Sequence, residues 1–418
     1  MEDLLNYTQS VLNSSLPTPD LMHGSNINQD YVYTPITYSN LSKFAKALLT
    51  GNPVVLLGEI GCGKSKMISF LAEMANQDKD LIEIHLDDQT DSKSLVGTYV
   101  CTDVPGEFKW QPGLITQAVL KGYWLVLDGV EKASLDVIAS ISTLLDRNVL
   151  CIPGSSKEIV AHANFRIIGT ISFSKNSDTN ISTGLEYAQA TSLRSFSSLW
   201  HILYVHPMTK HDINIILESK FSSINSKVKS CLLKTYDLLC SSGSIQSDSN
   251  RLTNSVKPFT LRDLIKVCSR IQQNIAFNAI SGYATESELV ACVCEVVEVY
   301  LSSVRDVSFQ IQLCTAVCHL FQLTSAHMEE IMILKRPLLN TSITITTIGR
   351  ISLPRMSAHD GDMSHGTGMN LIVPSGNIAP VQYAHTRHSL RLMEKIAACV
   401  RANEPVLLVG ETGWWVMN

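Results

Sequence analysis

A glycine-rich segment offers the clearest chemistry in the sequence. Residues 58–65 read GEIGCGKS and match the phosphate-loop pattern G-x-x-x-x-G-K-[ST]. Glycines let the backbone turn tightly and direct its N–H groups at phosphate oxygens. Lys64 can reach the β- and γ-phosphates, and the Ser65 hydroxyl can hold Mg²⁺. The predicted nucleotide-binding residues of this loop are Gly58, Glu59, Ile60, Gly61, Cys62, Gly63, Lys64 and Ser65.

An acidic partner for this loop follows a second apolar run. Asp128 ends YWLVLD and is predicted to orient Mg²⁺ or its water. Most phosphate-loop ATPases of this type place a glutamate directly after that aspartate, to polarise the attacking water, but here Gly129 follows. Glu131 is the candidate replacement, and the alternative is that it caps the next helix. The catalytic candidates are therefore Asp128 and Glu131, and the sequence supports nucleotide binding better than hydrolysis.

Elements able to position these residues alternate between strands and helices. Apolar runs of strand length, rich in Val, Ile and Leu, lie at 53–58, 80–86, 123–128 and 165–170. Helix-length amphipathic segments separate them, at 64–76 and 134–147 for example. Alternation of this kind predicts an α/β fold in which helices flank a parallel sheet. From about residue 208 to 305 only helical spacing remains, which predicts an all-helical domain.

Composition excludes several classes of protein. The chain has 418 residues, 45% hydrophobic and 17% charged, which is enough for more than one buried core. Its net charge of −5 argues against a protein that coats nucleic acid. No basic run with interleaved aromatics predicts direct nucleic-acid reading, and no apolar run predicts a membrane span. The 11 cysteines are scattered, and because no signal peptide precedes them we expect reduced thiols.

The end of the sequence repeats its beginning. A helical stretch followed by PVLLVGETG (405–413) resembles the helix and strand that lead into the phosphate loop at 41–61. We therefore expect the start of a second nucleotide-binding module. Trp414 and Trp415 stand where Gly-Lys-Thr would continue the loop, so this second copy is expected to be truncated and not to bind nucleotide.

Two longer motifs between the loop and Asp128 indicate a family. The runs DQTDSKSLVGTY (88–99) and PGEFKWQPG (105–113) resemble the midasin family of dynein-related AAA+ ATPases. The resemblance covers residues 35–305 and the second start after 385. It implies a phosphate-loop AAA+ core and a helical lid. The predicted domains are a lead-in (1–34), an AAA+ α/β core (35–207), a helical lid (208–305), a linker (306–384) with one helix at 309–335 and short strands, and a truncated second AAA+ module (385–418).

The resemblance also implies roles for residues outside the loop. Thr170 or Ser172 falls where the family places the polar sensor of the γ-phosphate, although the usual Asn is absent. Arg262 matches the lid arginine that touches nucleotide phosphate, with a solvent-exposed arginine paired to Asp263 as the alternative. Arg194 lies near the position of an arginine finger, but its surroundings match poorly and favour a surface arginine.

The function implied by the resemblance is that of an ATP- and Mg²⁺-dependent module in a six-module motor ring. In that family the ring matures precursors of the large ribosomal subunit in the nucleus, including the nucleolus and nucleoplasm. The implied partners are neighbouring AAA+ modules, pre-ribosomal large-subunit particles and assembly factors. The resemblance implies no membrane partner. Two alternatives stay open: a structural module that holds nucleotide without hydrolysis, and a MoxR-type AAA+ chaperone.

Two further features have weaker interpretations. The segment 106–113 alternates aromatic and charged residues and predicts a hairpin. Phe108 and Trp110 could contact a neighbour or substrate, but we expect the hairpin to pack on itself. A His/Asp-rich loop at 356–370 could bind metal through His359, Asp360, Asp362 and His365, yet no second ligand cluster supports this.

Overall fold

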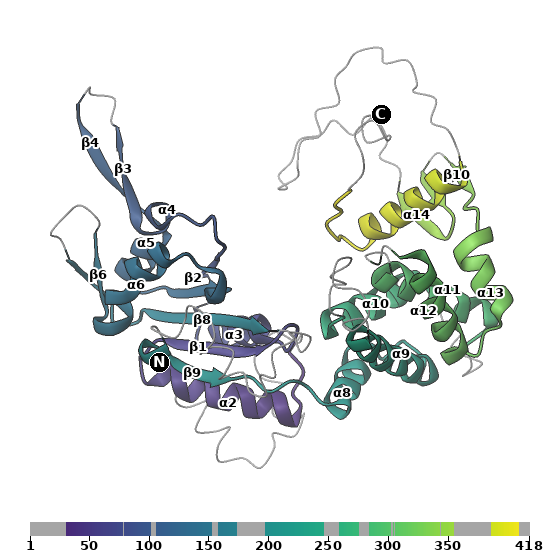
Figure 1. Ribbon diagram of the computed structural model, residues 1–418, viewed down its shortest axis with the longest axis horizontal. Helices are drawn as coiled ribbons and strands as arrows, with labels where there is room; N and C mark the ends of the chain where they lie inside the picture. Colours follow the sequence, from purple (N-terminus) through teal and green to yellow (C-terminus); the bar gives the residue numbers. More distant parts are fainter. Residues whose placement is uncertain are drawn as a thin grey trace. The chain divides into compact units, whose positions relative to one another are not determined.

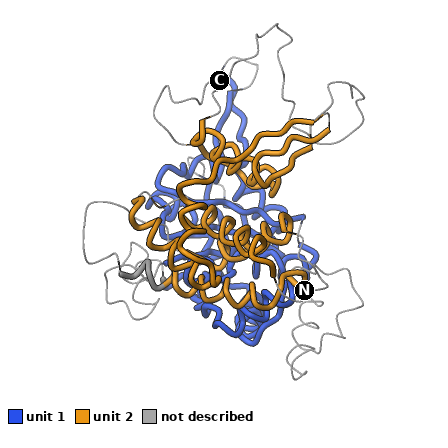
Figure 2. Tube along the Cα trace, turned by 90° about the vertical axis from the view of Figure 1, so that its right-hand side faces the viewer, with its two compact units in different colours: residues 1–220 blue, residues 221–418 orange. Residues whose placement is uncertain are grey.

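Two compact units make up the chain, residues 1–220 and 221–418 (Figure 2). The computed structural model describes residues 31–77, 79–101, 106–152, 158–173, 197–245, 259–275, 284–301, 304, 306–342, 344–354 and 386–408. Arg194 and the His/Asp-rich loop lie outside these ranges. Among the described residues, no helix is both long enough and apolar enough to span a membrane.

The first unit is built on a five-stranded sheet with the order β2-β5-β8-β1-β9 (Figure 1). Every neighbouring pair in it is parallel. Parallel strands need crossover connections, which helices supply here. The fold class predicted from strand–helix alternation is therefore confirmed. The strands are β1 (Val54–Glu59), β2 (Leu81–His85), β5 (Trp124–Asp128), β8 (Arg166–Phe173) and β9 (His201–Tyr204).

Helices cover both faces of this sheet. Alternate residues of one strand enter different cores, because successive side chains point to opposite faces. Val54 and Leu56 pack with α2 (Pro35–Leu49) and α3 (Lys64–Met74). Val55 and Leu57 enter the other core, with α4 (Ser92–Val96), α5 (Leu114–Lys121) and α6 (Leu135–Arg147). Burial on both faces explains why the strands are continuous apolar runs.

Smaller elements are added to this core. β3 (Gly97–Cys101) and β4 (Phe108–Pro112) form an antiparallel hairpin that projects from the sheet in Figure 1. The remaining elements of the unit are β6 (Val149–Cys151), β7 (Glu158–Val160), the 3-10 helices η2 (Val130–Lys132) and η4 (Ser197–Leu199), and α8 (Lys210–Lys220).

The second unit is mainly helical. Its helices are α9 (Ser226–Ile245), α10 (Leu261–Asn274), α11 (Glu286–Val296), α12 (Val307–Leu320), α13 (Ser325–Glu329) and α14 (Arg387–Arg401). Two π-helices, η6 (Val297–Leu301) and η7 (Glu330–Leu334), follow α11 and α13. A three-stranded antiparallel sheet consists of β10 (Leu339–Thr341), β11 (Ile345–Ile348) and β12 (Ile351–Pro354).

Two stretches differ from the sequence interpretation. The segment 309–335, expected as one helix, is broken after Leu320. Gln322 adopts a left-handed φ of 60°, which ends α12, and Thr324 occupies the N-cap position of the next helix, α13. Residues 405–408, expected as a strand, belong to no strand, and Leu407 is 87% exposed. The rest of the second loop, including both tryptophans, lies outside the described residues.

Candidate nucleotide site

The phosphate loop connects the carboxyl end of β1 to the first turn of α3. Gly61 and Gly63 have φ values of 82° and 94°, a left-handed conformation that favours glycine. Gly58 is required for space, because a Cβ there would lie 2.9 Å from Cys62 Sγ and 3.0 Å from the Val205 carbonyl oxygen. The loop therefore needs glycine at all three positions, for two different reasons.

Lys64 is turned into this loop. Its side chain is buried, and its Nζ donates to the carbonyl oxygens of Gly58 and Glu59, each at 2.9 Å. Burial lowers the pKa of this ammonium, while Cys62 and then the carboxylates of Glu131 and Asp128 act in the opposite direction. The ammonium is thus held at the loop within the field of both predicted catalytic acids.

Ser65 is placed differently from Lys64. It lies in the first turn of α3, is exposed, and its hydroxyl makes no hydrogen bond within the described residues. Its hydroxyl oxygen is the type of ligand that a hard cation beside the phosphates would take.

Asp128 ends β5, where it meets residues from both neighbouring strands. Its Oδ1 accepts a hydrogen bond from the Thr170 hydroxyl on β8, and its Oδ2 lies 3.0 Å from His85 Nδ1 on β2. Burial alone would raise the pKa of this carboxyl. The hydrogen bonds from Thr170 and His85 outweigh that effect and hold the pKa below its ordinary value. Asp128 is thus kept ionised and oriented.

Glu131 lies on η2, one turn beyond Asp128. One carboxylate oxygen accepts from the Ser172 backbone N–H at 3.4 Å, and the other, Oε2, is buried without a hydrogen-bond partner in the described part of the chain. Burial raises the pKa of this carboxyl. Ser134 caps α6, so the alternative role of Glu131 as that helix cap is wrong.

Gly129 decides where Glu131 points. It has a φ of 78°, and its N–H contacts the Thr170 carbonyl oxygen at 3.2 Å. This left-handed residue turns the chain sharply after β5 and starts η2. The glycine that replaces the usual glutamate is therefore also the residue that brings Glu131 toward β8.

The two sensor candidates have separate contacts. Thr170 is buried and bonds Asp128 through its side chain, whereas Ser172 contributes its backbone N–H to Glu131. Arg262 belongs to the second unit, where it is exposed in the first turn of α10 and forms no ion pair within the described residues. The carboxylate of Asp263 bonds Thr260 instead.

His85 was not singled out from the sequence. It pairs with Asp128 in the register of β2 with β5, and ligand atoms of Glu83, His85 and Asp128 lie within 4.8 Å of one another. The available signal was a polar residue at the carboxyl end of a predicted strand. Which strand lies beside β5 is not encoded locally, so the pairing required the tertiary structure.

Comparison with known proteins matches both units. Residues 53–185 match the AAA domain of the dynein-related subfamily, and residues 212–328 match the midasin AAA lid domain. Midasin of Dictyostelium discoideum is 29% identical over 92% of the chain, and midasin of Giardia intestinalis is 26% identical over 96%. The chain spans only 7% and 8% of the lengths of these two midasins. Protein NorQ of Paracoccus denitrificans is 31% identical over 30% of the chain and 46% of its own length.

Proposed function

The chain is a midasin-like AAA+ module, and on that basis we propose that it binds Mg·ATP and reports the nucleotide state to neighbouring AAA+ modules. The observation that carries the proposal is the loop that holds Lys64. A buried ammonium with two carbonyl partners can exchange them for phosphate oxygens without moving far.

The residues of the site fit a magnesium nucleotide. The loop supplies backbone N–H groups and the Lys64 charge for the phosphates. Ser65 supplies a free hydroxyl and Asp128 an ionised carboxylate, the oxygen ligands that Mg²⁺ prefers. When bound, the cation would neutralise charge on the β- and γ-phosphates. Arg262 is proposed to contact nucleotide phosphate from the lid.

Hydrolysis is proposed to use Glu131. Its partnerless Oε2 can accept a proton from water, and its raised pKa makes it a better base than an ordinary glutamate. Ser172 orients the carboxylate through its backbone N–H. Thr170 and His85 keep Asp128 in place as the neighbouring, ionised carboxylate.

The wider role is proposed from the family. As part of a midasin-like ring, the module would act with neighbouring AAA+ modules on pre-ribosomal large-subunit particles and assembly factors in the nucleus. The agreement with midasins extends through the lid, whereas the match to NorQ covers 30% of the chain. This extent favours the midasin-like role over that of a MoxR-type chaperone.

In one alternative function, the site binds ATP but does not hydrolyse it. In a structural module, nucleotide would be held without hydrolysis. The observation in its favour is Gly129, which leaves no carboxylate directly after Asp128. The two functions differ in whether bound ATP releases phosphate.

Calorimetry and single-turnover hydrolysis test the proposal. The wild-type chain should bind one Mg·ATP. Lys64→Ala should weaken binding by at least about 100-fold, because the phosphates lose a buried cation. Lys43→Ala, an exposed lysine on α2, is the matched control and should bind normally. Equal affinity in Lys64→Ala would remove the loop from the site. Retained ATP without phosphate release would favour the structural alternative.

A further inference from the structure

A cavity of about 410 Å³ opens in the second unit. Its walls come from α11, η6, α12, η7, the turn between β11 and β12, and α14. Cavities of this size hold small molecules in other proteins. The cationic side chains that line it outnumber the carboxylates by four to two: Lys335, Arg350, Arg391 and Lys395 against Glu298 and Glu394. The cavity therefore has an excess of two positive charges, with His388 counted as neutral.

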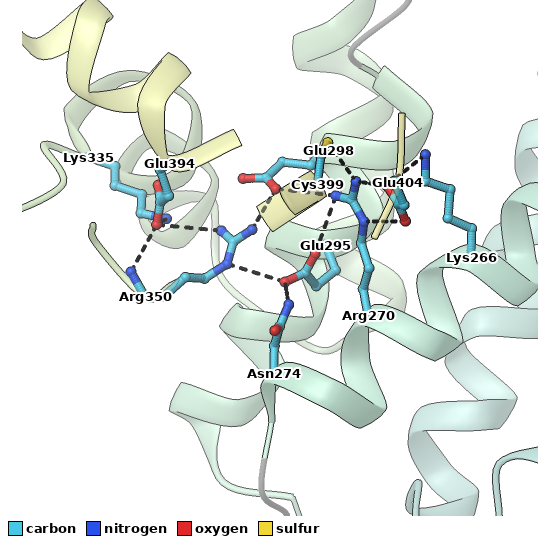
Figure 3. A network of polar contacts seen from close by, with 10 residues as sticks. All are labelled: Lys266, Arg270, Asn274, Glu295, Glu298, Lys335, Arg350, Glu394, Cys399 and Glu404. Atoms are coloured by element: carbon cyan, nitrogen blue, oxygen red, sulfur yellow. Dashed lines mark hydrogen bonds and ion pairs between the residues drawn. The ribbon is translucent and has the colours of Figure 1, made fainter. Parts of the chain in front are cut away.

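Both carboxylates of the cavity already have cationic partners (Figure 3). Oε2 of Glu298 lies 2.6 Å from Nη2 of Arg350. Oε1 of Glu394 lies 3.1 Å from the Lys335 ammonium, and it also accepts the backbone N–H of Arg350 at 3.1 Å. Neither carboxylate is therefore left to pair with Arg391 or Lys395.

The charges just beyond the cavity do not change this balance. Glu404 accepts a hydrogen bond from Nε of Arg270 at 3.0 Å and lies 2.9 Å from the Lys266 ammonium. Glu295 lies 3.3 Å from Nε of Arg350 and 3.8 Å from Nη1 of Arg270. These two carboxylates and two further cations belong to the same network in Figure 3. Including them adds equal numbers of both signs, so the excess of two positive charges is unchanged.

Three of the lining cations have donors without an anionic partner. The side chain of Lys395, an exposed residue of α14, makes no hydrogen bond or ion pair within the described residues. Arg391, one turn earlier, donates to two backbone carbonyl oxygens of η7, at 2.7 and 2.9 Å, and to no carboxylate in the described part of the chain. Nη1 of Arg350 is buried without a hydrogen bond there, 3.9 Å from Oε1 of Glu394. A buried donor of this kind is costly unless a partner satisfies it.

The electrostatics at Lys395 also favour an anion. The protein around this side chain partly desolvates its ammonium and lowers the pKa. Glu298 opposes that shift, whereas the like charges of Arg391 and Arg350 add to it. A bound anion would relieve this repulsion. A phosphate monoester carries about two negative charges near pH 7, which matches the excess, and guanidinium groups fit phosphate oxygens in pairs.

We propose that this cavity binds a small molecule that carries a phosphate group, held by Lys395, Arg391 and Arg350. The apolar side chains of the wall, among them Leu301 and Leu392, would contact the rest of such a molecule. The cavity lies in the second unit, whereas the phosphate loop lies in the first, so the inference does not depend on the proposed function.

Acetylation of lysines, read by mass spectrometry, tests the site at Lys395 itself. The full 418-residue chain carrying Lys64→Ala is used without Mg²⁺, so that the phosphate loop does not compete. Phenyl phosphate at about ten times its dissociation constant should slow acetylation of Lys395 about tenfold. Lys234, an exposed lysine of α9 that does not line the cavity, is the internal control and should react at an unchanged rate.

Two further additions identify what is recognised. Potassium chloride at the same ionic strength should protect neither lysine. Inorganic phosphate distinguishes the free anion from an ester: protection equal to that by phenyl phosphate would assign the cavity to phosphate itself. An unprotected Lys395 with both phosphate probes, or equal protection by chloride, would overturn the site.

Calorimetry with variants in the same Lys64→Ala chain completes the test. Lys395→Gln removes an exposed side chain without a partner and should leave the fold intact. It should weaken binding of phenyl phosphate at least about tenfold, because a charge-assisted hydrogen bond is lost. Lys234→Gln is the matched control and should bind normally. Equal affinity in Lys395→Gln would overturn the proposed site, whatever the phosphate loop of the first unit binds.

Discussion

Asp128 and Glu131 are three residues apart, yet their surroundings shift their pKa values in opposite directions. Hydrogen bonds from Thr170 and His85 lower the pKa of Asp128, while burial raises that of Glu131. Two carboxyls whose pKa values are shifted in opposite directions can take different tasks, one as a fixed anion and the other as a proton acceptor.

The role of Glu131 can be tested by removing its charge. Glu131→Gln should lower the rate of phosphate release by at least about 100-fold, because the water would lose its base. Nucleotide affinity should stay within about threefold, as measured by calorimetry. Asp136→Asn on the exposed side of α6 is the control and should keep the wild-type rate. An unchanged rate in Glu131→Gln would assign the base to another group.

Replacing Gly129 by the glutamate that usually follows the aspartate is not expected to improve hydrolysis. Gly129→Glu restores the usual acidic residue. The backbone at this position is left-handed, however, and a residue with a side chain is less stable in that conformation by about 1–2 kcal/mol. We expect a lower melting temperature and no gain in phosphate release. A faster variant with unchanged stability would show that the turn can rearrange, and that Glu131 is not a required replacement.

At the scale of elements, the β3–β4 hairpin is packed unevenly. Trp110 contacts Tyr99 edge to face with ring centroids 5.0 Å apart, whereas Phe108 is 64% exposed. The expectation of a self-packed hairpin therefore applies to Trp110, and Phe108 is the more accessible of these two aromatic side chains.

Urea denaturation can compare how much Trp110 and Phe108 each contribute to the free energy of unfolding. Trp110→Ala should lower the free energy of unfolding by about 1–2 kcal/mol, since it removes an aromatic pair and its buried area. Phe108→Ser should change it by less than about 0.5 kcal/mol, as expected for an exposed position. A large loss in Phe108→Ser would mean that this ring is covered in solution.

At the scale of the whole molecule, ion pairs between buried side chains are found within the described part of the second unit, as between Arg270 and both Glu295 and Glu298. The sheet of the first unit is packed between two apolar cores. In the second unit, a small cluster around Ile351 and Ala398 packs α14 on β11 and β12, and Lys266 and Arg270 of α10 form ion pairs with Glu404, which follows α14. Its stability should therefore respond more strongly to pH.

The lowered pKa of Glu404 predicts whether the stability of the second unit rises or falls with pH. Its pKa in the folded chain is below the ordinary value, so its stabilising effect is complete above the ordinary glutamate range and is lost as pH falls through the lower, folded value. Glu404→Gln should cost about 3 kcal/mol at pH 7, because it unbalances a buried pair. The difference from wild type should shrink below about pH 4, as followed by urea denaturation across pH. A constant difference would mean that Glu404 does not carry the effect.

The sequence by itself determined the phosphate loop, the parallel sheet and the helical character of the second unit. Each is encoded locally, as glycine spacing in GEIGCGKS, as apolar runs of strand length, or as helical periodicity. The break at Gln322 was missed because it depends on one left-handed residue inside a continuous helical pattern.

Only the tertiary structure decided which side chains meet. His85 and Thr170 contact Asp128 because β2 and β8 flank β5 in the sheet. In the sequence, His85 is 43 residues from Asp128 and Thr170 is 42 residues from it. Arg270 and Glu404 are 134 residues apart. Such pairs depend on strand order and helix packing, which no local pattern encodes, so the loop could be found in the sequence while the partners of its acids could not.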